Sequence, residues 1–195
     1  MRKSESIYKL EETHLNTLDY FITREWSEVL HYLAKHQKEA LSMRTERGAE
    51  FQCPYYYNML GDQLWDIAKK HLREGYTLLF SPCLDTQECL AFGTIGLGEN
   101  NSDMIEVVFG PGKVRELDNH PNKISLIIPK GRMKAIIAQE HELTDDRIIL
   151  LNTIFKKVKD ALYDEIPCVI EWSWYSQGVG RLGTKDIYWE IRDNV

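Results

Sequence analysis

Three glycines near the end of the sequence form the pattern that most strongly suggests chemistry. Gly178, Gly180 and Gly183 spell Gly-x-Gly-x-x-Gly, and Arg181 and Lys185 lie within or just after it. In dinucleotide-binding proteins this motif opens a helix, whereas here a strand follows it. We therefore predict an anion- or phosphate-binding loop at 178–185, because backbone N–H groups, guanidinium and ammonium all favour anions. The alternative is a hairpin loop that is polar only for solubility.

A second candidate site combines residues of acid–base type. Asp118 and His120 are separated by one residue in a segment between predicted strands, and His141 lies between two glutamates. Such residues could serve in hydrolysis or phosphoryl transfer if they met Arg181. Turn formation alone also explains the Asp-Asn-His stretch. A metal normally needs three or four converging ligands, and the sequence does not bring Asp118, His120 or Glu171 near the His141 segment, so no metal site is predicted.

The elements that would position these residues change in type along the chain. After residue 75, short stretches alternate apolar and polar residues, as half-buried strands do. The clearest are 168–175 and 186–192, which would flank the glycine loop as a hairpin with three tryptophans on its strands. Further strands are predicted at 76–80, 89–95, 104–109, 114–117, 123–128 and 133–138, the first two as another hairpin.

Helices are predicted where apolar residues recur at spacings of three and four. Residues 10–47 fit one long helix or a pair in series, 59–73 fit a shorter helix, and 144–164 fit the clearest one. Thr144 is the expected N-cap of the last helix.

This element order predicts an α+β fold. Most connections between strands are too short for parallel crossovers, so we expect a mainly antiparallel sheet of five to seven strands. The helices would pack on one face of it. A length of 195 residues suits a single domain over 1–195, with a helical part at 8–74 and a sheet-rich part at 76–195.

Composition narrows the class of protein. The net charge of −6 disfavours nucleic acid as a partner, since nucleic-acid binders usually carry a basic stripe. The four cysteines include no Cys-x-x-Cys pair, which makes a zinc or thioredoxin-type motif unlikely. The sequence has no apolar run of membrane-span or signal-peptide type. These features predict a cytoplasmic protein without a membrane anchor, and they point to no particular cofactor.

Together these observations favour a binding or regulatory protein whose ligand is a small anion or a protein partner. The first alternative is a hydrolase or phosphoryl-transfer enzyme using Asp118, His120 and Arg181, with His141. The second is an acidic interaction module, of a defence, counter-defence or antitoxin type, that blocks a basic partner. The three adjacent tyrosines at 55–57 and the five tryptophans leave room for an apolar patch and a homodimer.

Overall fold

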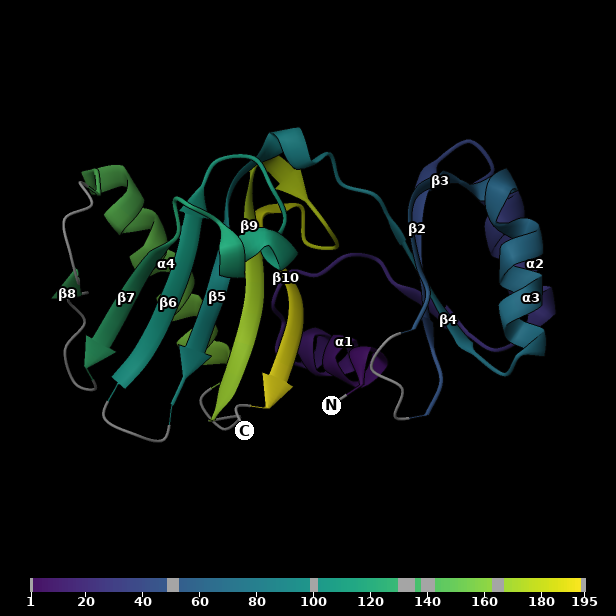
Figure 1. Ribbon diagram of the computed structural model, residues 1–195, viewed down its shortest axis with the longest axis horizontal. Coiled ribbons are helices and arrows are strands. Elements are labelled where there is room, and N and C mark those ends of the chain that lie inside the picture. Colours follow the sequence, from purple (N-terminus) through teal and green to yellow (C-terminus); the bar gives the residue numbers. More distant parts are fainter. Residues whose placement is uncertain are drawn as a thin grey trace. The chain divides into compact units, whose positions relative to one another are not determined.

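The computed structural model describes residues 2–48, 53–98, 102–129, 136–137, 143–162 and 167–193. The chain divides into two compact units. The smaller unit comprises Arg2–Glu5 and Leu18–Leu84, and the larger unit comprises Ser6–Thr17 and Asp85–Val195. Each unit contains helices and one antiparallel sheet (Figure 1), so the α+β class predicted from the sequence is confirmed. The strands form two sheets rather than one, while the expectation of a single domain stays a prediction.

The smaller unit is a four-stranded antiparallel sheet with the strand order β1-β4-β2-β3. Its elements are β1 (Phe21–Thr23), α2 (Trp26–Lys35), β2 (Ala40–Glu46), β3 (Tyr55–Leu60), η1 (Gly61–Leu64), α3 (Trp65–Arg73) and β4 (Thr77–Pro82). Residues of both α-helices pack against buried residues of β2 and β4 in one cluster. That cluster includes Val29 and Ala68 from the helices, and Met43 and Phe80 from the strands.

The prediction of helix over residues 10–47 is largely wrong. Helix α1 (Lys3–Glu12) ends early, and β1, α2 and β2 follow it. Glu25, not Thr23, is the N-cap of α2, and the hydroxyl of Thr23 accepts the N–H of Glu25 at 2.9 Å just before the helix. In β2, Leu41 and Met43 are fully buried while Arg44 is exposed, so the spacing that resembled a helix belongs in part to a strand.

The larger unit is a six-stranded antiparallel sheet with the strand order β10-β9-β5-β6-β7-β8. Its elements after residue 84 are η2 (Thr86–Glu88), β5 (Cys89–Leu97), β6 (Ser102–Phe109), η3 (Val114–Asn119), β7 (Ile124–Pro129), β8 (Ile136–Ile137), α4 (Asp145–Ala161), β9 (Cys168–Val179) and β10 (Thr184–Asp193). The predicted final hairpin is β9 and β10, and the predicted last helix is α4, which begins directly after Thr144.

Two predictions about connections need correction. The proposed hairpin of 76–80 with 89–95 does not form, because β4 pairs with β1 and β2 whereas β5 pairs with β6 and β9. Residues 114–117 are not a strand but part of η3. There the backbone N–H of Glu116 donates to the carbonyl of Lys113 at 2.9 Å, and the Glu116 side chain accepts the N–H of Lys113. These two bonds curl the chain into a turn of helix.

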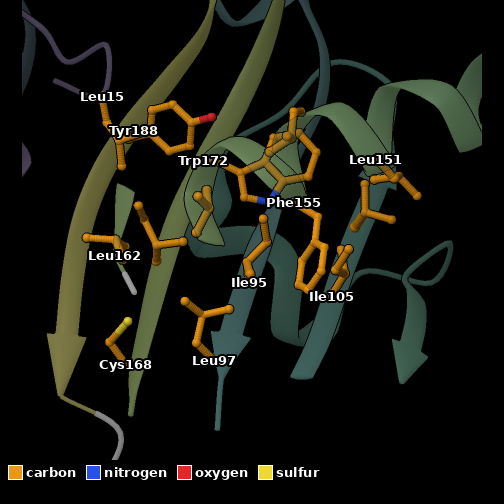
Figure 2. Packing of buried hydrophobic residues seen from close by; sticks show 14 of the residues in the cluster. Leu15, Ile95, Leu97, Ile105, Leu151, Phe155, Leu162, Cys168, Trp172 and Tyr188 are labelled. Atoms are coloured by element: carbon orange, nitrogen blue, oxygen red, sulfur yellow. The ribbon is translucent and has the colours of Figure 1, made fainter. Parts of the chain in front are cut away.

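Helix α4 covers one face of the six-stranded sheet and lies behind it in Figure 1. Figure 2 shows Phe155 from this helix and Ile95, Ile105 and Trp172 from three strands in one buried cluster. Two ion pairs tie the helix to the strands, Lys159 to Asp103 at 3.0 Å and Lys157 to Asp186. Within the described ranges, no helix has the length and apolar character needed to span a membrane.

Candidate functional site

The face of the six-stranded sheet opposite α4, here called the open face, carries the polar side chains of the central strands. Successive side chains of a strand point to opposite faces. In β5 and β6, Ile95 and Ile105 belong to the core under α4, so Thr94 and Glu106 point the other way. Helix η3 lies on this open face, where it contacts β5, β6 and β9 and crosses in front of the sheet (Figure 1).

Three glutamates on the open face fall in a single row across the sheet. The strand register places these residues side by side, in the order of the strands β10, β9, β5, β6 and β7: Glu190, Glu171, Thr94, Glu106 and Ser125. We call these five residues the acidic row. Neighbouring strands lie about 4.8 Å apart, so the whole row spans roughly 19 Å.

Two basic residues pair with the acidic row. Arg192 contacts both Glu171 and Glu190, with 3.3 Å between its Nε and Oε1 of Glu190. Lys123 contacts Glu106 with 2.8 Å between Nζ and Oε1. The three glutamate side chains are only 17 to 19% exposed. Three half-buried carboxylates and two cations therefore share this face.

The pKa values of the basic residues reflect these carboxylates. Burial alone would lower the pKa of Arg192, but the charges of Glu171 and Glu190 outweigh burial and raise it. The hydrogen bond to Glu106 is the main cause that raises the pKa of Lys123, and the charges of Glu106 and Asp118 add to it. The raised pKa values favour the cationic form of both side chains.

An aromatic layer borders the acidic row on the side of η3. The ring of His120 meets the ring of Phe92 edge to face, with 5.9 Å between centroids. A side chain at Gly112 would collide with the Phe92 ring at 2.5 Å, so η3 and the turn before it approach the sheet closely. Next to Phe92 in the sheet, Ser173 accepts a hydrogen bond from the indole N–H of Trp189 at 2.8 Å.

Asp118 and His120 lie together at the end of η3, whereas Arg181 lies in a different element. Asp118 is exposed in η3, and His120 directly follows that helix, where its Nδ1 accepts the N–H of Asn122 at 3.3 Å. Arg181 lies in the loop between β9 and β10 and pairs with Glu11 at 2.7 Å. His141 is outside the described residues. A catalytic role for Asp118 and His120 stays a prediction.

The glycine loop uses its N–H groups within the protein. Arg181 donates its N–H to the carbonyl of Thr17 at 2.9 Å, and Leu182 donates to Oδ1 of Asn16 at 2.8 Å. Gly180 and Gly183 have φ values of +69° and +62°, which explains why glycine occupies these positions. The anion-binding role of this loop, with exposed Lys185 beside it, stays a prediction, and an anion would have to displace Asn16 and Thr17.

Sequence reasoning missed the acidic row. The alternation in 168–175 and 186–192 already places Glu171 and Glu190 on the polar side of the final hairpin. Their proximity to Glu106 follows only from the strand order, which puts β9 beside β5 and β5 beside β6. Among the described residues, no group of three or more His, Cys, Asp or Glu side chains is arranged so that it could hold a metal ion.

The fold is similar to those of several solved structures at low sequence identity. Three solved structures resemble it: the macrocyclase MdnC bound with the precursor peptide MdnA from Microcystis aeruginosa (9% identity, TM-score 0.55), an ADP complex of PurK, N5-carboxyaminoimidazole ribonucleotide synthetase (12%, 0.56), and PH1788 from Pyrococcus horikoshii (14%, 0.55). They match 97%, 95% and 100% of this chain, which covers 51%, 42% and 92% of theirs.

The chain therefore spans about half the length of the macrocyclase and less than half of PurK. No family model matches the sequence, and no curated protein matches it. The likeness concerns the fold.

Proposed function

We propose that this protein binds a magnesium nucleotide, ATP or ADP, on the open face of the six-stranded sheet, as part of a ligase-type activity. The acidic row is the observation that carries this proposal. The likeness of the fold to a synthetase solved with ADP supports it. The ligand is still a small anion, as the sequence led us to expect, but its proposed site is the sheet and not the glycine loop. The proposed role is ligase-type chemistry and not regulation.

The carboxylates suit Mg²⁺ as the partner of a nucleotide. This ion prefers oxygen ligands, and proteins usually hold it with one or two carboxylates together with the phosphates of the substrate. Glu171 and Glu190 lie on neighbouring strands and would supply the carboxylates, and Glu106 lies two strands from Glu171. When bound, Mg²⁺ would offset the negative charge of the phosphate oxygens.

Arg192 would bind the phosphates directly. Its guanidinium already lies against two carboxylates, yet the side chain is 57% exposed, so part of its planar donor set faces solvent. Guanidinium pairs strongly with phosphate because it can donate two parallel N–H bonds. Lys123, 26% exposed beside Glu106, provides a second cation on the same face.

The phosphoryl-transfer alternative is compatible with this placement. His120 lies on Phe92, next to the acidic row, and would border a nucleotide bound there. A proton-transfer role for His120 is a separate proposal, which applies only if the nucleotide binds on the open face.

Titration calorimetry of the full chain tests the proposal. Mg-ADP should bind, and excess EDTA should weaken that binding. Glu171→Gln and Glu190→Gln keep the side-chain size but remove charge, and each should weaken Mg-ADP binding at least tenfold. Glu12→Gln is the matched control, because Glu12 is an exposed glutamate on α1, and it should change the affinity less than twofold. Equal affinity in Glu171→Gln and the parent protein would place the nucleotide elsewhere.

A further inference from the structure

One end of the four-stranded sheet in the smaller unit carries three exposed arginines. Arg44 lies near the end of β2, Arg47 directly follows that strand, and Arg24 directly follows β1. The register places Glu46 opposite Thr77, and Nε of Arg24 donates to the hydroxyl of Thr77 at 2.6 Å. The ends of β1 and β2 therefore meet at the start of β4. We define the arginine patch as Arg24, Arg44 and Arg47 together with Tyr55 and Tyr76.

Two of these arginines lie over tyrosine rings. The guanidinium carbon of Arg44 is 4.6 Å from the centre of the Tyr55 ring, and that of Arg47 is 4.5 Å from the centre of the Tyr76 ring. Tyr55 is the register partner of Arg44 on β3, the end strand of the sheet, and is 39% exposed. Each pair presents a planar cation supported by an aromatic ring.

Neighbouring residues hold the second pair in place. Nη1 of Arg47 donates to the carbonyl of Glu74 at 3.1 Å, just after the end of α3. The ring of His71 meets the Tyr76 ring edge to face, with 5.3 Å between centroids. Because Arg44 and Arg47 are three positions apart at the end of β2, the two pairs are separated by roughly 10 Å. A ligand of a few repeating units would reach both.

The exposed charge of the patch is predominantly positive. Three acidic residues adjoin it, and two of them are engaged elsewhere. The carboxylate of Glu74 contacts His71 at 3.1 Å and Lys70 at 3.9 Å, and one carboxylate oxygen of Glu46 is buried. Glu25 is exposed beside the patch. An anionic ligand would therefore meet three guanidinium groups and one exposed carboxylate that is not paired with a cation of the same helix.

The combination of guanidinium groups and rings fits single-stranded nucleic acid. Guanidinium binds phosphate with two parallel N–H bonds, and unpaired bases stack on aromatic rings and on guanidinium planes. An acidic peptide would use the charges and leave the planar surfaces unused. The chain's net charge of −6 does not oppose this assignment, because residues 18–84 contain eight Lys and Arg against nine Asp and Glu. Most of the excess negative charge lies outside the smaller unit.

We propose that the arginine patch binds single-stranded nucleic acid, with phosphates on the arginines and bases stacked on the Arg44–Tyr55 and Arg47–Tyr76 pairs. The patch lies within the smaller unit, whereas the acidic row lies within the larger one. The strand site is thus a second binding site, and it does not depend on the nucleotide site proposed above.

Fluorescence anisotropy of the full chain tests this inference with three labelled strands of ten units. One strand is made of deoxyadenosine, one of adenosine, and one of abasic units that keep the phosphates and lack the bases. Both base-bearing strands should bind, and the abasic strand should bind at least tenfold more weakly. Equal binding of all three would overturn the assignment, because the patch would then be a general surface for polyanions, acidic proteins included.

Variants separate the contribution of charge from that of stacking. Arg44→Ala should weaken binding at least fivefold and reduce the slope of log Kd against log salt by about 0.7, the contribution of one phosphate contact. Arg44→Lys should keep that slope, yet the preference for bases over abasic units should fall, because an ammonium group has no plane for stacking. Tyr55→Ala should lower the same preference. Lys35→Ala is the matched control, since Lys35 is an exposed cation at the end of α2, and it should change the affinity less than twofold.

The remaining outcomes distinguish this inference from the proposed function. Saturating Mg-ADP should change the affinity for the deoxyadenosine strand less than twofold, and full competition would assign the patch to the nucleotide instead. A protein that binds the strand but not Mg-ADP would refute only the proposed function. A protein that binds neither base-bearing strand, or whose Arg44→Ala and Tyr55→Ala variants bind as tightly as the parent, would refute the inference made from this patch.

Discussion

The side-chain amide of Asn16 donates a hydrogen bond to the carbonyl oxygen of Asp186, 170 residues later in the sequence, at 2.7 Å. The same amide donates to the carbonyl of Val179 at 2.8 Å, and its oxygen accepts the N–H of Leu182 at 2.8 Å. Asn16 is fully buried. One side chain therefore satisfies backbone groups on both sides of the glycine loop and holds that loop in shape.

Replacing Asn16 with alanine should destabilise the protein by roughly 3 kcal/mol, because several buried backbone groups lose their partner at about 1 kcal/mol or more each. Urea denaturation followed by far-UV circular dichroism measures this change in the free energy of unfolding. Asn152→Ala, at an exposed position of α4, should stay within about 0.5 kcal/mol. An Asn16→Ala protein as stable as its parent would show that the loop does not depend on this residue.

The double variant Arg181→Ala, Lys185→Ala separates the two candidate anion sites. If the nucleotide lies on the open face, Mg-ADP affinity should fall less than twofold, since Arg181 is already paired with Glu11. Calorimetry on the variant gives the answer directly. A tenfold loss with unchanged circular dichroism would instead support the glycine loop that the sequence suggested.

Lowering the pH should reduce the free energy of unfolding, in part because Asp186 becomes protonated. Burial alone would raise the pKa of this carboxyl, but hydrogen bonds from Lys157 and Thr184 and the charge of Lys157 outweigh burial and lower it. Since the pKa is lower in the folded state, the stabilisation is present above the ordinary value of 3.8 and is lost as the pH falls through the folded value.

Asp186→Asn tests this linkage. At pH 7 it should cost about 2 kcal/mol, which is less than the roughly 3–5 kcal/mol of a fully buried pair because Lys157 is 36% exposed. Below pH 4 the difference between variant and parent should shrink. The measurement is the free energy of unfolding by urea at several pH values from 2.5 to 7, and a constant difference would contradict the role given to this pair.

Two glycines of β5 should respond differently to the same substitution. Gly93→Ala should destabilise the protein by about 3 kcal/mol or prevent folding, because the new Cβ meets the backbone of β6 at 2.0 Å, which only a shift of the strands relieves. Gly96→Ala should cost less than about 1 kcal/mol, since its Cβ makes ordinary contacts. Thermal unfolding of both variants side by side measures the contrast, and similar melting temperatures would contradict it.

The sequence predicted the larger unit better than the smaller one for a physical reason. In 168–175 and 186–192 the alternation of large apolar residues with polar ones is strong, and one register buries Trp172 and Tyr188 together. Before residue 47 the apolar residues that seemed to form one stripe come from different elements, including Leu15 before β1 and Val29 in α2. Local spacing cannot separate a helix from a series of short elements whose apolar residues happen to recur at similar intervals.

The candidate site depends on the strand order of the sheet, which local sequence patterns do not contain. Glu171 and Glu190 are adjacent because their strands form a hairpin, which the sequence indicated. Glu106 joins them only because β5 lies between β9 and β6, although 77 positions separate the register partners Thr94 and Glu171 in the sequence. By contrast, the glycine motif from Gly178 to Gly183 suggested an anion-binding loop. The structure gives a local reason for two of these glycines, because Gly180 and Gly183 have positive φ values.

The segment that carries Asn16 also covers the outer side of β10, the end strand of the six-stranded sheet. The N–H of Tyr188 donates to the carbonyl of Asn16 at 2.8 Å, and the N–H of Ile191 donates to the hydroxyl of Ser6 at 2.7 Å. A strand with unpaired backbone donors at the end of a sheet can recruit a strand from another molecule and start aggregation. Residues 6–17 thus cover backbone donors that could otherwise pair with a strand of another molecule. We expect mutations that detach this segment from β10 to reduce solubility before they affect ligand binding.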